Sequence, residues 1–101
     1  MKVQVHSIHF DADQKLINFI QVRIDKLHTF YDRLVGGEVF LKLNNEGIEN
    51  KTVEIKISVP GRKLFAKEQA RSFEAAVDLA TEALRSQLGR LKTRLRSKRQ
   101  S

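Results

Sequence analysis

The residues with the clearest chemical potential are the cations near the end of the chain. From Arg85 to Ser101 there are seven Lys or Arg residues and no acid, and the last acid is Glu82. The whole chain of 101 residues has 19 Lys and Arg against 12 Asp and Glu, a net charge of +7. The excess positive charge therefore lies in the final segment, where Arg outnumbers Lys. Guanidinium groups pair with phosphate through two hydrogen bonds, so we expect a polyanionic partner.

These cations follow a helical spacing together with a series of leucines. At about 100° per residue, one edge of a helix would carry Leu84, Leu88, Leu91 and Leu95. Two basic rows flank this edge: Arg85, Lys92, Arg96 and Arg99 on one side, and Arg90, Arg94 and Lys98 on the other. Like charges four residues apart repel each other, and a merely solubilising surface would not need cations alone. RNA phosphates would neutralise both rows, which favours nucleic-acid binding.

Other chemistries find little support in the sequence. The three histidines, His6, His9 and His28, lack the spacing of a metal site, and there is no cysteine. The phosphate-binding loop of nucleotide hydrolases is absent, and Gly36-Gly37 is expected to form a turn. We therefore expect a protein that is not an enzyme and that uses no metal, cofactor or small-molecule substrate.

Apolar periodicity predicts the elements that must position the cations. Alternating residues predict strands near 2–6, 38–43, 52–59 and 62–69. Apolar residues from Leu16 to Tyr31, three or four apart, predict a helix over about 14–31 with Asp13 as its N-cap. Ser72 can cap a second helix that extends to about residue 95, with residues 96–101 frayed.

The predicted fold class is α+β, a single domain of order β-α-β-β-β-α. Strands two to four should form an antiparallel meander in a four-stranded sheet, with two helices packed on one face. This arrangement is similar to a double-stranded-RNA-binding domain. No linker or repeat divides the sequence, so we expect a single domain over residues 1–101.

Three stretches of the chain resemble the short ribosome hibernation promoting factor family, also called ribosome-associated inhibitor or sigma-54 modulation protein. They are KVQVHSIHFDADQKLINFIQ, KLHTFYDRLVGGEVFLKL and SFEAAVDLATEALRSQLGRLKTRLRSK, and the resemblance covers about residues 1–98. The last stretch is the most specific. It contains a mid-helix acid, a Gln-Leu pair and an alternating basic series: Asp78, Gln87, Leu88, Arg90, Lys92, Arg94 and Arg96.

The resemblance implies a factor that binds the small (30S) ribosomal subunit through 16S rRNA. It would occupy the channel between head and body, overlap the messenger and tRNA sites, and silence translation by steric occlusion in stationary phase or stress. Carried over by position, the implied rRNA contacts are Arg23, Lys26, Arg33, Arg90, Lys92, Arg94 and Arg96. The helical rows add Arg85, Lys98 and Arg99 as candidates.

We expect a cytoplasmic protein that is a monomer away from the ribosome and does not bind membranes. The N-terminus lacks the continuous apolar segment of a signal peptide, and no apolar run is long enough to cross a bilayer. One alternative is a general double-stranded-RNA-binding module, but such modules carry a Lys cluster where this chain has Ser72 and Glu74. A second is an amphipathic helix on anionic lipid, for which the leucine edge is narrow and lacks Trp.

Overall fold

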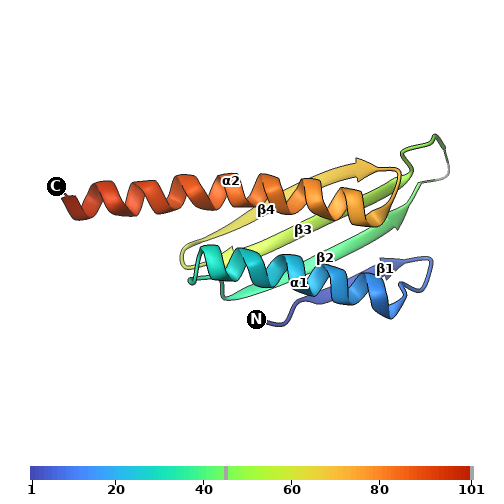
Figure 1. Ribbon diagram of the computed structural model, residues 1–101, viewed down its shortest axis with the longest axis horizontal. Coiled ribbons are helices and arrows are strands. Elements are labelled where there is room, and N and C mark those ends of the chain that lie inside the picture. Colours follow the sequence, from blue (N-terminus) through green and yellow to red (C-terminus); the bar gives the residue numbers. More distant parts are fainter. Residues whose placement is uncertain (45, 101) are drawn as a thin grey trace.

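Two layers, a sheet and a pair of helices, make up the fold (Figure 1). The computed structural model describes residues 1–44 and 46–100, and it describes side chains within 1–44 and 46–94. The element order is β1 (Gln4–Ile8), α1 (Gln14–Phe30), β2 (Gly36–Leu43), β3 (Lys51–Val59), β4 (Arg62–Ala70) and α2 (Phe73–Gln100). The predicted fold class and the predicted β-α-β-β-β-α order are therefore confirmed.

The sheet is mixed, with the spatial order β1-β2-β3-β4. β1 pairs with β2 in parallel, whereas β2, β3 and β4 form the predicted antiparallel meander. Val39, Ile55 and Ala66 are register partners across three strands, and all three are buried. Their side chains therefore form part of the single face that packs against the helices.

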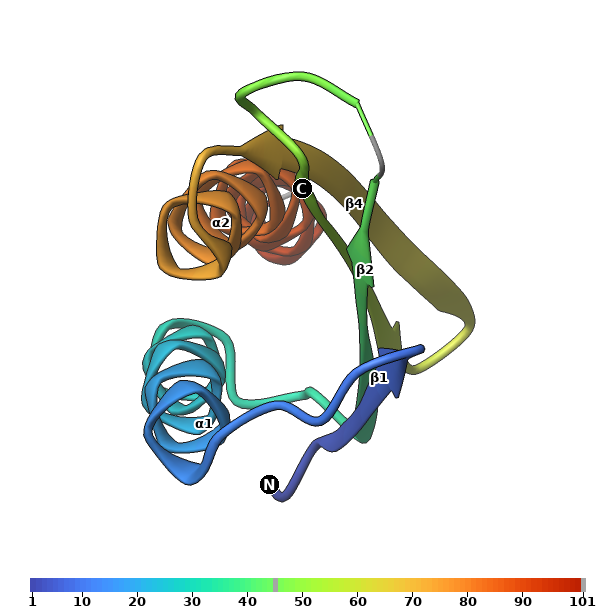
Figure 2. The same cartoon turned by 90° about the vertical axis from the view of Figure 1, so that its right-hand side faces the viewer.

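Both helices cover this buried face, as the end-on view in Figure 2 shows. α1 starts at the predicted cap, where the carboxylate of Asp13 accepts a hydrogen bond from the Leu16 backbone N–H at 2.8 Å. The Ser72 hydroxyl caps α2 in the same way by accepting from the Ala75 N–H at 3.1 Å. The predicted apolar row of α1 is buried, and so are Leu84 and Leu88 of the predicted leucine edge of α2.

α2 is longer than the sequence indicated. The helix continues to Gln100, whereas the sequence predicted fraying after about residue 95. Arg, Lys and Gln are good helix formers, and cations near a helix C-terminus interact favourably with its dipole. A helix of 28 residues is about 42 Å long, whereas nine-residue strands span about 30 Å. α2 therefore projects beyond the sheet (Figure 1), and the molecule measures 51 × 25 × 19 Å.

Gly36 and Gly37 belong to β2, so the prediction of a turn at this pair was wrong. They pair with Ser58 and Ile57 of β3. A Cβ added at Gly37 would lie 3.1 Å from Cγ1 of Val3, which is closer than side chains normally pack. The absence of a side chain at Gly37 therefore allows the N-terminal segment to lie close against β2.

Candidate nucleic-acid interface

The C-terminal ends of both helices lie at one end of the molecule. α1 and α2 run side by side in the same direction, and the loop 31–35 and the Pro60-Gly61 turn lie at this end as well (Figure 1). We call it the basic end, and it contains Arg33, Arg62, Arg90, Lys92 and Arg94. Cations at helix C-termini complement the partial negative charge of the last carbonyl groups.

Two members of one predicted basic row, Arg85 and Lys92, contact α1. The Arg85 guanidinium carbon lies 4.7 Å from the centre of the Phe30 ring, and the Lys92 ammonium lies 4.6 Å from it. The Lys92 ammonium also donates a hydrogen bond to the Phe30 backbone carbonyl at 3.0 Å. Lys92 therefore satisfies one of the carbonyl groups that the end of α1 leaves without an intrahelical partner. Both cations help hold the two helices together.

Arg23 also makes a contact between the helices. Its Nε lies 2.7 Å from Oδ1 of Asp78 on α2, and its guanidinium carbon lies 4.7 Å from the centre of the Phe19 ring. Arg23, Lys26 and Arg85 line a shallow groove between the helices together with two acids, Asp78 and Glu82. The groove therefore has mixed charge. Asp78, the mid-helix acid of the sequence resemblance, forms an ion pair with Arg23.

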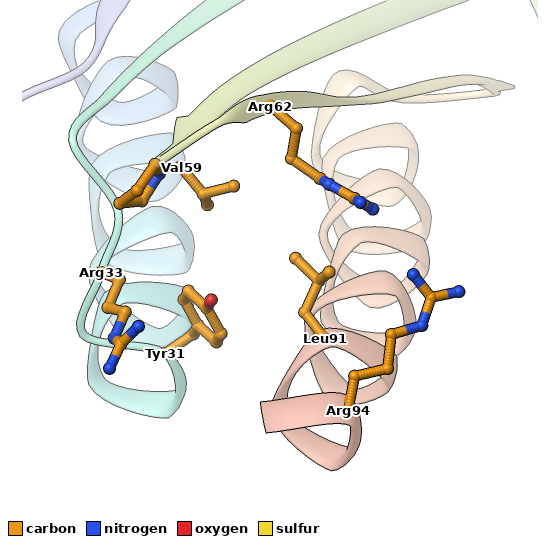
Figure 3. Close-up of a pocket in the computed structure, with 7 residues that line it drawn as sticks. Tyr31, Arg33, Val59, Arg62, Leu91 and Arg94 are labelled. Atoms are coloured by element: carbon orange, nitrogen blue, oxygen red, sulfur yellow. The ribbon is translucent and has the colours of Figure 1, made fainter. Parts of the chain in front are cut away.

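Arg94, from the other basic row, faces the strand side of the basic end. A pocket of about 290 Å³ lies between the end of α1, the β3–β4 turn and α2 (Figure 3). Its lining residues are Tyr31, Arg33, Val59, Pro60, Arg62, Leu91 and Arg94. Three of them are arginines, and none of these residues, all within the described part of the chain, is acidic. The charged residues that line this pocket are therefore all cations.

Sequence reasoning missed Arg62, although the strand pattern contained the signal. α1 leads directly into β2, and β3 runs antiparallel to β2, so the β3–β4 turn must lie near the end of α1. Arg62 is the first residue of β4 after that turn. Its position beside the two helix ends could therefore have been inferred from topology alone.

The predicted residues fall into three groups. Arg33 and Arg94 line the pocket, and Arg90 and Lys92 lie at the same end of the molecule. Arg23, Lys26 and Arg85 lie along the groove between the helices. The side chains of Arg96, Lys98 and Arg99 fall outside the described residues.

Three further observations bear on the competing interpretations. Leu84 and Leu88 are completely buried, so most of the described leucine edge is not available to lipid. In the part of the chain that was searched, no helix is long and apolar enough to cross a membrane. Within the same part, no group of three His, Asp or Glu side chains could hold a metal ion.

Comparisons with known proteins match nearly the whole chain to one family. Residues 3–96 match the sequence profile of the family described as sigma 54 modulation protein / S30EA ribosomal protein. The chain is 27% identical over 101 residues to the ribosome hibernation promotion factor of Deinococcus radiodurans, covering 96% of this chain but 52% of that protein. It is 24% identical over 97 residues to the ribosome hibernation promoting factor of Pseudomonas putida, covering 96% and 92%. The chain thus spans about half of the first relative and nearly all of the second.

Two solved structures share the fold. A ribosomal subunit interface protein from Coxiella burnetii superposes with a TM-score of 0.83 at 19% identity, covering 92% of this chain and 99% of that one. The N-terminal domain of Thermus thermophilus protein Y superposes with a TM-score of 0.79 at 20% identity, covering 90% and 99%. At these identities the likeness establishes the arrangement of helices and strands.

Proposed function

Because the chain belongs to the sigma 54 modulation protein / S30EA ribosomal protein family, we propose that it is a ribosome hibernation factor. It binds the small ribosomal subunit through 16S rRNA, in the channel that messenger and tRNA otherwise occupy. The observation that carries this proposal is the gathering of cations at the ends of two parallel helices, on a chain with no acid after Glu82. The names of the related proteins support the same role.

The proposed mechanism is occupancy without chemistry. A polyanionic channel attracts the basic end, and each phosphate contact releases counterions, which drives association. α2 projects beyond the sheet and can extend this contact along the channel wall. The bulk of the domain then excludes messenger and tRNA from the same space. Such a role needs no nucleophile or metal and would place the protein in the cytoplasm.

Co-sedimentation with purified ribosomal subunits tests the proposal. The variant Arg90→Ala/Arg94→Ala removes two exposed cations from the basic end. The matched control Lys15→Ala/Arg71→Ala removes two exposed cations from the opposite end, where both helices begin. The wild-type protein and the control should sediment with small subunits, and the basic-end variant should bind at least about tenfold more weakly.

Two results would contradict the proposal. One is wild-type protein that sediments equally well with large and small subunits. The other is an equal loss of binding in both double variants, which would indicate a response to net charge and not to the basic end.

A further inference from the structure

Two arginines approach each other across the pocket at the basic end. Arg62 extends from the start of β4 and Arg94 from α2, and their guanidinium groups point toward one another (Figure 3). No acid is among the described residues that line the pocket. Like charges held this way repel each other, and an anion between them would remove the repulsion and bind both groups. The arrangement therefore favours occupation by a phosphate group.

Tyr31 supplies a second, independent feature of the same pocket. The residue is only 7% exposed, and its hydroxyl end faces the pocket (Figure 3). Across residues 1–44 and 46–94 the hydroxyl has no hydrogen-bond partner, yet every fully buried polar side-chain atom there has one. The Tyr31 oxygen is therefore not fully buried, and Tyr31 is one of the residues that line the pocket. A hydroxyl held by a buried ring is a fixed donor and acceptor for a bound group.

The remaining walls suit a nucleotide more than an isolated ion. Leu91, Val59 and Pro60 contribute apolar surface beside the arginines and the hydroxyl. A phosphate, a ribose hydroxyl and an apolar sugar face occur together in an RNA strand. RNA recognition typically combines phosphate contacts with contacts to the ribose 2′-hydroxyl.

We propose that this pocket binds one phosphate of an RNA strand between Arg62 and Arg94, while the Tyr31 hydroxyl hydrogen-bonds to the same nucleotide. The proposal rests on the proposed function and adds two residues to it. Arg62 becomes an RNA-binding residue that comes from β4, not from α2. Tyr31 becomes a residue that contributes a hydrogen bond but no charge, so its contact should not depend on salt.

Binding to purified small subunits over a series of salt concentrations tests the assignment. Arg62→Ala should weaken binding about tenfold or more, because a hydrogen bond to a charged group is lost. It should also make the slope of log K against log salt about 0.7–0.9 shallower, the amount expected for one phosphate contact. Tyr31→Phe should weaken binding about 2- to 10-fold and leave the slope unchanged. Arg71 lies just beyond the other end of β4, so Arg71→Ala should match the wild type in affinity and in salt slope.

The outcomes separate this proposal from the proposed function. If Arg62→Ala behaves like Arg71→Ala while the wild type binds small subunits, the pocket assignment is overturned and the function stands. Wild-type affinity in Tyr31→Phe would overturn the nucleotide contact. Failure of the wild type to bind would reject the function itself. Urea denaturation of each variant confirms that the binding comparison uses folded protein.

Discussion

Lys92 has a structural contact that its place in the alternating basic series did not indicate. Its ammonium group lies against the Phe30 ring and donates a hydrogen bond to that residue's carbonyl oxygen, while its predicted rRNA contact stays a prediction. Arg94, two positions further along, is exposed and lines the pocket. Neighbouring cations of one helix therefore lie in different surroundings: Lys92 contacts the end of α1, and Arg94 lines the pocket.

Replacing Lys92 and replacing Arg94 should have different effects on the stability of the domain. Lys92→Met keeps the apolar stem but removes the charge, so unfolding free energy should fall by about 1–3 kcal/mol through the lost hydrogen bond and cation–π contact. Arg94→Ala should change it by no more than about 0.5 kcal/mol, as is usual for exposed positions. Urea denaturation measures both values. Equal stability of Lys92→Met and the wild type would show that the contact with Phe30 contributes nothing.

At the scale of elements, α2 combines a packing helix and a projecting helix in one continuous segment. Leu84 and Leu88 are fully buried in the core, whereas Leu91 is only partly buried. The Gln87 side chain donates to the Phe65 carbonyl oxygen at 3.1 Å and so ties α2 to β4. Burial of the first part fixes the direction in which the basic part leaves the sheet.

Truncating a leucine in the packing part should therefore unfold the domain readily. Leu84→Ala should cost about 2–5 kcal/mol, because a fully buried side chain is replaced by a cavity. Leu79→Ala on the same helix is the matched control, since Leu79 is 45% exposed and its loss should cost less than about 1 kcal/mol. Thermal denaturation followed by circular dichroism gives the comparison. Similar costs for both variants would mean that the buried face of α2 is assigned incorrectly.

Features that depend on residues close in the sequence could be predicted from it. Contacts between residues far apart in the sequence could not. Asp13 and Ser72 act as caps within three residues of their partners, and strand alternation is equally local. The role of Gly37 depends on Val3, and the role of Lys92 depends on Phe30, contacts that only the folded chain creates. The candidate site was consequently predicted as a set of cations but not as a pocket, and its strand residue, Arg62, was absent from the set.

Charge is distributed along the long axis of the whole molecule. Where both helices begin, a groove is lined by three acids, Asp11, Asp13 and Glu74, and one cation, Lys15. The opposite end gathers the arginines of the pocket. A polyanion attracts one end and repels the other, so the domain should approach the ribosome with its basic end first.

The affinity for small subunits should depend strongly on salt. If about five cations contact phosphates, log K should fall against log salt with a slope of about −3.5 to −4.5. Equilibrium binding at several potassium concentrations provides the slope. An affinity that stays constant from low to moderate salt would exclude an electrostatic interface.

Titration of cell-free translation with the purified protein tests the central claim most directly. If the protein acts by occupying the channel, inhibition should be complete near about one protein per ribosome when binding is tight, because each bound molecule blocks one site. Excess initiator tRNA and messenger should reverse the inhibition, and the rRNA should remain intact. Complete inhibition at far below one molecule per ribosome, or cleaved or modified rRNA afterwards, would contradict occlusion and indicate catalysis.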